Sequence, residues 1–160
     1  SFLVFCFLLF VFRYIPHPPN FTPVIAFCIY IPLIFGFWSI PFFILGYAIT
    51  DFFIGFHTLL IWTWGSLALI SILYKFSNGT FSRIGLSLFG AICFFIISNF
   101  GVWVGSSFYE PNLQGLINCY VMAIPFFTNT LISTALFASL FEILLKYRIF
   151  FTSSQFRKVN

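Results

Sequence analysis

Side chains that could do chemistry are rare in this sequence, and most of them fall in three short segments between long apolar runs. These candidates are Arg13, His17, Asn20, Asp51, His57, Tyr109, Glu110 and Asn118. The set combines a guanidinium, imidazoles, amides and carboxylates, which donate and accept hydrogen bonds in complementary ways. If the chain brings the three segments together, the side chains could bind a small polar ligand.

Catalysis is not indicated by the spacing of these residues. The sequence has no Ser-His-Asp arrangement, no His-Glu-x-x-His and no phosphate-cradling glycine loop. His17, Asp51 and His57 could hold a first-row metal ion, because such ions accept imidazole and carboxylate ligands. The two histidines could instead hold a haem. No supporting motif surrounds them, so we expect neither an enzyme nor a bound cofactor, and the metal site stays an alternative.

Arg13 and Asp51 permit two interpretations. They could form an ion pair that pins two helix ends together, or Arg13 could bind a carboxylate or phosphate ligand through its planar fork. The third acidic residue, Glu142, stands four residues before Lys146. This spacing predicts an ordinary ion pair along one helix.

The composition predicts an integral membrane protein. The 160 residues are 61% hydrophobic and 6% charged, and the mean hydropathy is +1.09, whereas soluble domains contain about 25% charged residues. The net charge of +4 is the balance of seven Lys and Arg against three Asp and Glu, and the basic residues lie at the ends of apolar runs, which is typical of topology signals. We therefore expect no nucleic-acid partner, and a single multi-pass domain over residues 1–160 in the inner (plasma) membrane.

The apolar runs predict about six transmembrane helices and no strands. The runs cover residues 1–12, 23–50, 56–74, 84–105 and 116–145. Residues 23–50 would extend about 42 Å as one helix, and Pro32, Gly36 and Pro41 interrupt them. Two short helices folded about Gly36–Pro41 are favoured, with one long tilted helix as the alternative. The last run contains Pro125, so it is either a long kinked helix or a half-buried entry segment followed by a helix.

The basic residues predict the orientation. Lys75 and Arg83 bracket one loop, and the polar, basic tail at 146–160 lies two helices further along the chain. Both therefore lie on the same side, which the positive-inside rule places in the cytoplasm. Six helices then put both termini in the cytoplasm and the three polar segments on the outer face. With five helices, residues 13–20 would move to the cytoplasmic side.

The outer polar residues predict a binding site for a small molecule. Ligand sites are mostly apolar and aromatic, with a few convergent polar groups, and polar side chains close to a membrane often mark function. Trp64 and Trp103 would stack on a flat ligand. Asn99 lies inside an apolar run, where it would contact the ligand or bridge two helices.

One stretch of the sequence resembles the opening of a family of small, uncharacterised bacterial inner-membrane proteins. It reads Arg13-Tyr-Ile-Pro-His-Pro-Pro-Asn-Phe-Thr-Pro23. Similar pieces follow at Asp51 with Gly55 and His57, at Asn99-Phe-Gly-Val-Trp103, and from Gly115 through Cys119-Tyr120 to Ile124-Pro-Phe-Phe127. The resemblance covers nearly the whole chain, but it implies no particular activity.

The size, the six-helix plan and the outward polar site are also similar to the substrate-binding S components of energy-coupling-factor transporters. This likeness implies capture of a vitamin-like micronutrient, with a separate coupling subunit and ATPases, because the chain has no nucleotide site. One feature departs from it: residues 1–12 contain no Ala or Gly for a docking face. A structural subunit of a larger membrane complex, or a metal- or haem-handling membrane protein, are the alternative functions.

Overall fold

The structure is a computed structural model that describes residues 2–55 and 59–147. These residues are almost entirely helical. In chain order the elements are α1 (Phe2–Tyr14), α2 (Val24–Phe35), α3 (Ser39–Ile54), α4 (Leu60–Ile72), the 3-10 helix η1 (Leu73–Phe76), α5 (Thr80–Gly105) and α6 (Leu113–Lys146). The expected all-helical class and the expected helix in each apolar run are confirmed.

Proline and glycine set the helix ends that shape the bundle. α1 ends before the prolines at positions 16, 18 and 19, which cannot continue a helix. α2 ends at Gly36, whose φ of 87° favours glycine, and α3 ends at Gly55 with φ of 120°. The prediction of two short helices between Pro23 and Thr50 is therefore confirmed.

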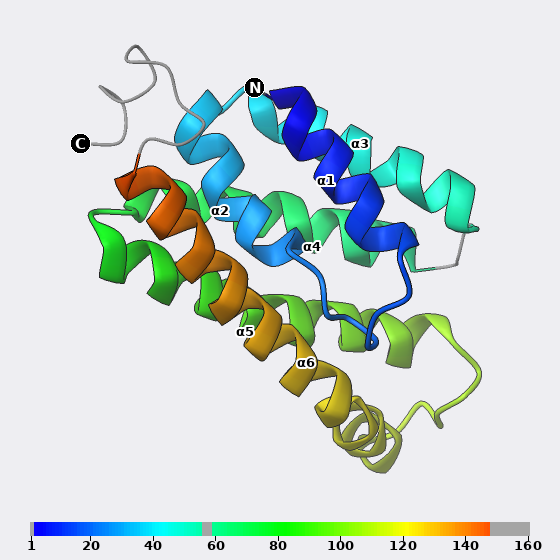
Figure 1. Ribbon diagram of the computed structural model, residues 1–160. Coiled ribbons are helices and arrows are strands. Elements are labelled where there is room, and N and C mark those ends of the chain that lie inside the picture. Colours follow the sequence, from blue (N-terminus) through cyan, green and yellow to red (C-terminus); the bar gives the residue numbers. More distant parts are fainter. Residues whose placement is uncertain (1, 56–58, 148–160) are drawn as a thin grey trace.

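The helices differ greatly in length. At 1.5 Å per residue, α5 and α6 extend about 39 Å and about 51 Å, whereas α2 extends only about 18 Å. α5 and α6 are both long and apolar enough to cross a membrane. Pro125 lies inside α6, and the first turns of α6 point away from the direction of the rest (Figure 1), as a proline kink does.

α2 is the centre of the bundle. Its residues from Val24 to Ile34 are all buried, and it packs against each of the other five α-helices. Neighbouring contacts place the others around it in the order α1, α3, α4, α5, α6 (Figure 1). An apolar surface on every side is what a fully enclosed helix needs, and this explains why α2 carries no charge.

Aromatic rings close this circle between α6 and α1. The rings of Phe5 and Phe141 stack with centroids 5.7 Å apart, and Phe12 meets Phe137 edge-on at 5.1 Å. Phe141 also stacks on Tyr30 of α2 at 5.0 Å. Such pairs add specific geometry to the burial of large apolar surfaces, so the first and last helices are joined mainly by side chains.

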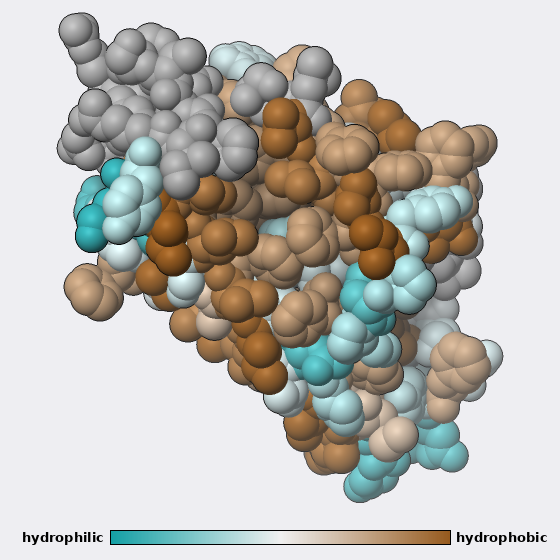
Figure 2. Space-filling view, in the orientation of Figure 1, coloured by the Kyte–Doolittle hydropathy of each residue, from teal (hydrophilic) through white to brown (hydrophobic). Residues whose placement is uncertain are grey.

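The polar segments separate to two ends of the bundle. The 14–23 loop, Gly55 and the 106–112 connection lie at one end, while η1, the start of α5 and the end of α6 lie at the other. Between the ends, apolar side chains dominate the visible surface, and hydrophilic patches gather mainly at the loops (Figure 2). The 14–23 loop, Gly55 and the 106–112 connection therefore share one end of the bundle.

Candidate functional site

Arg13 occupies the last turn of α1 and reaches across to α3. Its Nη2 donates to Asp51 Oδ1 at 2.6 Å, and its Nη1 donates to the Tyr47 carbonyl at 3.2 Å and to the Thr50 hydroxyl. The Tyr47 ring covers one face of the guanidinium, with 3.8 Å from Cζ to the ring centroid, which is a cation–π arrangement. The side chain is thereby fixed in position and orientation.

Asp51 ties this arrangement to a third helix. Its second oxygen accepts the indole N–H of Trp64, on α4, at 2.7 Å. Asp51 is only 1% exposed, and Arg13 is 13% exposed, so the carboxylate lies behind the guanidinium as seen from outside. The ion pair, one of the two interpretations of Arg13 and Asp51, is present. Together with the Trp64 bond it joins α1, α3 and α4 in what we call the Arg13 cluster: Arg13, Tyr47, Thr50, Asp51 and Trp64.

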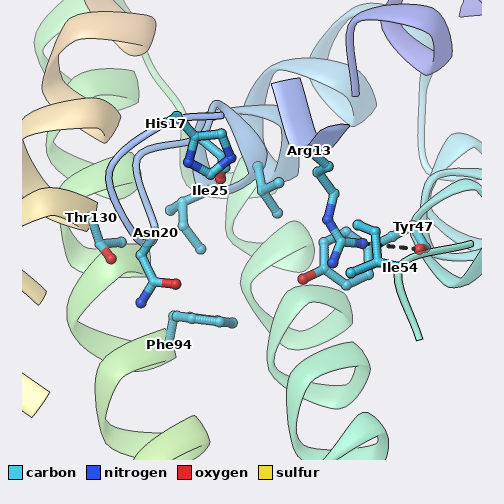
Figure 3. Close-up of a pocket in the computed structure, with 10 residues that line it drawn as sticks. Arg13, His17, Asn20, Ile25, Tyr47, Ile54, Phe94 and Thr130 are labelled. Atoms are coloured by element: carbon cyan, nitrogen blue, oxygen red, sulfur yellow. Dashed lines mark hydrogen bonds between the residues drawn. The ribbon is translucent and has the colours of Figure 1, made fainter. Parts of the chain in front are cut away.

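Two neighbouring cavities lie beside the Arg13 cluster. Their volumes are about 230 Å³ and 320 Å³, and together their lining includes residues of all six α-helices. Both share Arg13, Asn20, Tyr47, Phe94 and Thr130. Arg13 and Tyr47 lie on one side of the first cavity, with Asn20, Phe94 and Thr130 across from them and His17 on the loop above (Figure 3).

The second cavity continues between α5 and α6. Its additional lining residues are Thr63, Phe95, Ser98, Asn99, Val102, Ala123, Phe126 and Phe127. Arg13, His17, Asn20 and Asn99 are therefore the sequence candidates that line the cavities. Asp51 and Trp64 stand behind Arg13 and hold it.

The loop that covers this region is held by α6. Asn129 donates from Nδ2 to the Pro19 carbonyl at 3.0 Å, and Asn20 adopts a left-handed conformation with φ of 63°, which asparagine tolerates better than most residues. His17 is exposed, with Nδ1 2.8 Å from the Pro18 carbonyl. The proline-rich sequence thus becomes a short, ordered rim.

Four other candidates gather away from the cavities, at the connection between α5 and α6. Trp103 donates its indole N–H to the Glu110 carbonyl at 3.0 Å, Glu110 binds the Asn112 amide, and Asn118 accepts from Gln114. Tyr109 lies in the same connection. These residues, Trp103, Tyr109, Glu110 and Asn118, are separated from Arg13 because α5 and α6 extend well beyond the shorter helices.

The described residues do not form a metal centre. Among them, no three His, Cys, Asp or Glu side chains lie close enough together to hold a metal ion. His57, which belonged to the alternative metal site, lies outside the described residues. His17 is exposed on the rim, while Asp51 is buried in an ion pair with Arg13.

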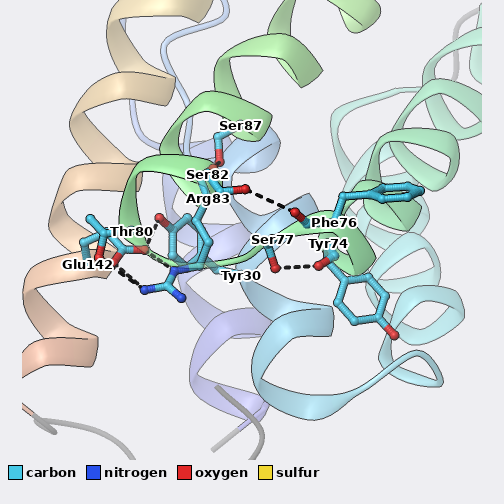
Figure 4. A network of polar contacts seen from close by, with 9 residues as sticks. All are labelled: Tyr30, Tyr74, Phe76, Ser77, Thr80, Ser82, Arg83, Ser87 and Glu142. Atoms are coloured by element: carbon cyan, nitrogen blue, oxygen red, sulfur yellow. Dashed lines mark hydrogen bonds and ion pairs between the residues drawn. The ribbon is translucent and has the colours of Figure 1, made fainter. Parts of the chain in front are cut away.

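A second polar cluster lies at the opposite end of the bundle. Glu142 accepts two bonds from Arg83, from Nε at 2.6 Å and from Nη2 at 2.8 Å. It also accepts the Tyr30 hydroxyl at 2.7 Å and the Thr80 hydroxyl at 2.7 Å (Figure 4). The prediction that Glu142 pairs with Lys146 was wrong. The actual partner is Arg83 because α6 turns this face of the helix inward, where the carboxylate is 10% exposed.

Several lining residues were absent from the sequence prediction. Tyr47, Thr63, Ser98 and Thr130 each stand inside an apolar helix, where Ser98 adjoins Asn99 and Thr130 adjoins Asn129. The sequence marks these residues only as polar interruptions of apolar runs. Polar residues buried elsewhere in the bundle, such as Ser71 and Ser87, interrupt apolar runs in the same way, so this signal does not identify the residues of the cavities.

A protein-family comparison identifies the chain's relatives. The model of a family of unknown function, DUF6580, matches residues 1–151. The chain belongs to this family. Searches of curated proteins and of solved structures gave no match. Membership in DUF6580 agrees with the expected uncharacterised family, and it brings no activity with it.

Proposed function

We propose that this DUF6580 protein is a multi-pass membrane protein that binds a small molecule in the cavities beside Arg13. The observation that carries the proposal is the pair of cavities, which together are lined by residues of all six α-helices and are bordered by a guanidinium that Asp51 holds in place. Polar groups that are held in position among aromatic and apolar side chains are typical of ligand sites.

The apolar exterior supports the membrane part of the proposal. Large hydrophobic side chains are exposed along the helices, including Phe7 at 66%, Ile61 at 83% and Phe81 at 93%. In water, so much exposed apolar surface would cause aggregation, whereas lipid covers it favourably. α5 and α6 are long enough to cross a bilayer of about 30 Å. The shorter helices would be completed by local thinning of the bilayer or by their loops.

The charge distribution supports an orientation with the cavities outside. Lys75, Arg83 and Lys146 lie at the end of the bundle away from the cavities, and the positive-inside rule assigns that end to the cytoplasm of the inner membrane. Both termini then lie inside the cell. A ligand captured from outside would make this protein the substrate-capture subunit of an uptake system, with a vitamin-like or other micronutrient as substrate.

Transport would require partners. An S-component-like role would place the chain with a membrane-embedded coupling subunit and ATPases. A ligand-stabilised protein that purifies alone in detergent would support capture, and co-purification with coupling proteins would support transport.

Filling the cavity tests the proposal. Ala123 is buried and lines the second cavity, while its neighbour Met122 is 64% exposed. Compounds from a metabolite library that raise the thermal midpoint of the wild type should fail with Ala123→Trp and still act on Met122→Trp. If the Ala123→Trp variant does not fold, Ala123→Leu is the substitute test, because this smaller change should partly reduce the stabilisation by the same compounds. No stabilising compound at all, or equal stabilisation of all variants, would contradict the proposal.

A structural subunit of a larger complex is the second candidate. α3 carries an exposed apolar stripe of Phe42, Leu45, Ile49 and Phe53, from 50% to 60% exposed, at the spacing of one helix face. A partner helix could cover this stripe as well as lipid could. Chemical crosslinking in native membranes distinguishes a structural subunit from a ligand-binding protein. A structural subunit would give one fixed set of crosslinked partners, and this set would be the same for the wild type and for the Ala123→Trp variant.

A further inference from the structure

The charge around the cavities restricts what they can bind. The described lining residues of both cavities include no Asp or Glu. Their one permanent cation, Arg13, is already paired with Asp51 at 2.6 Å. Removing a charged ligand from water is costly unless an opposite charge compensates it. An uncharged ligand therefore fits this site best.

The walls formed by α4, α5 and α6 present hydrogen-bond acceptors. Thr63, Ser98 and Thr130 each donate their hydroxyl hydrogen to the carbonyl four residues earlier in their own helix, at 3.0, 2.6 and 3.0 Å. A hydroxyl has one hydrogen to donate and two lone pairs. Their oxygens can therefore offer only lone pairs to the cavity, and the ligand must supply N–H or O–H groups.

Asn99 adds to the same wall. Its Nδ2 donates one hydrogen to the Phe95 carbonyl at 2.7 Å, which fixes the amide orientation and leaves Oδ1 as an acceptor beside the second N–H. Asn99 and Ser98 follow each other in α5, and both line the second cavity. Neighbouring acceptors of this kind match a ligand that carries N–H groups on one edge.

The opposite wall presents donors. A guanidinium has five N–H hydrogens, and the bonds from Arg13 to Tyr47, Thr50 and Asp51 use three of them. Up to two remain for a ligand, and they can bind a carbonyl oxygen. The ligand therefore needs both C=O and N–H groups.

Aromatic rings add a preference for flat molecules. Phe94, Phe95, Phe126 and Phe127 all line the second cavity, and the rings of Phe95 and Phe127 stack with centroids 4.4 Å apart. Planar ligands gain most from such faces. Resting on the proposed binding function, we infer that the cavities take a small, flat, uncharged molecule of the amide, lactam or ureide class.

Four matched probes test this ligand class. Benzamide is neutral and carries C=O and N–H, N,N-dimethylbenzamide lacks the N–H, benzoate is an anion and benzylammonium is a cation. Calorimetric titration of the purified protein should give benzamide the highest affinity, by about tenfold over each other probe, because unmatched hydrogen bonds and uncompensated charges both weaken binding. Equal or stronger binding of any other probe would overturn the inference.

A pair of serine variants tests the acceptor wall. Ser98 and Ser87 both lie on α5 and bond the carbonyl four residues earlier, but only Ser98 is a described lining residue. Ser98→Ala should weaken benzamide about three- to tenfold, and Ser87→Ala should leave it unchanged. Equal effects of the two variants would overturn the inference.

Failure of this inference can be told apart from failure of the proposed function. Binding of benzoate or N,N-dimethylbenzamide in preference to benzamide, abolished by Ala123→Trp, would refute the ligand class and keep the binding site. Absence of binding by all four probes would also refute the ligand class. The library screen with Ala123→Trp and Met122→Trp then decides the binding function by itself.

Discussion

The two ends of this bundle use the same chemistry in different ways. At each end an arginine meets a carboxylate from a distant helix, with tyrosine and threonine side chains around it. Arg83 and Glu142 form a two-pronged contact, and both carboxylate oxygens receive further hydroxyl groups. Arg13 contacts Asp51 through one nitrogen and faces a cavity. Each arginine donates three side-chain hydrogen bonds within its cluster, so the difference between the two ends is the cavity beside Arg13. The pair away from the cavities joins helices, whereas the proposed role of the pair beside them is also to receive a ligand.

Removing Glu142 should have the largest effect on stability. Glu142→Leu leaves Arg83, which is 9% exposed in its side chain, as a buried charge without its carboxylate, and it also deprives Tyr30 and Thr80 of their acceptor. Breaking a buried pair from one side costs about 3–5 kcal/mol. The loss should appear as a lower free energy of unfolding in a detergent titration.

Glu110→Leu is the matched control for this change. Glu110 is an exposed acid at the other end of the bundle. The free energy of unfolding of Glu110→Leu should therefore stay within about 0.5 kcal/mol of the wild-type value. A loss of similar size in both variants would show that the Arg83 pair has no special structural role.

Removing Asp51 should cost less stability but affect binding. Asp51→Leu leaves Arg13 beside a cavity that water can enter, so the guanidinium can be rehydrated in part. We expect a loss of about 2–3 kcal/mol, the range for hydrogen bonds to charged groups, together with loss of benzamide binding. Glu142→Gln, a milder change at the far end, should keep benzamide binding. Wild-type affinity of Asp51→Leu for benzamide would contradict the claim that the Arg13 pair, unlike the Arg83 pair, takes part in ligand binding.

Replacing both partners of each pair should have the smallest effect on stability. Arg83→Met with Glu142→Leu, and Arg13→Met with Asp51→Leu, each remove both charges, and such replacements are often neutral or stabilising. The free energy of unfolding of both double variants should lie within about 2 kcal/mol of the wild-type value. Only the pair at Arg13 should lose ligand binding, as measured by the same titration of benzamide.

Much of the helix plan could be predicted from the sequence because proline and glycine act locally. Pro32, Gly36 and Pro41 indicated a break inside a charge-free run, and the chain does turn between α2 and α3. Arg13 and Asp51 could be matched because charged residues are so few in this sequence that the possible partners are limited.

Other features depend on packing between distant segments. Glu142 has a plausible partner four residues away in Lys146, and nothing local reveals that Arg83, 59 residues earlier, is the true one. Likewise, Trp103 and Glu110 were grouped with Arg13 because they share an end. Helix length separates them, since α5 and α6 extend farther than the rest.

The lining hydroxyls illustrate a third limit. Thr63, Ser98 and Thr130 are small polar residues in apolar helices, and such residues commonly bond their own backbone. Their sequence context is the same whether they face a cavity or a neighbouring helix. Only the crossing of α4, α5 and α6 brings them to one wall.

The central position of α2 has a consequence for the order in which the protein can be assembled. Ribosomes make α2 long before α6, yet α6 supplies part of the surroundings of α2: the Tyr30 hydroxyl donates to Glu142, 112 residues later in the chain. Until α6 has been synthesised and has packed against α2, the Tyr30 hydroxyl lacks its acceptor. The centre of this bundle is therefore completed only after α6 has been made, and chains that stop before α6 would leave part of α2 exposed.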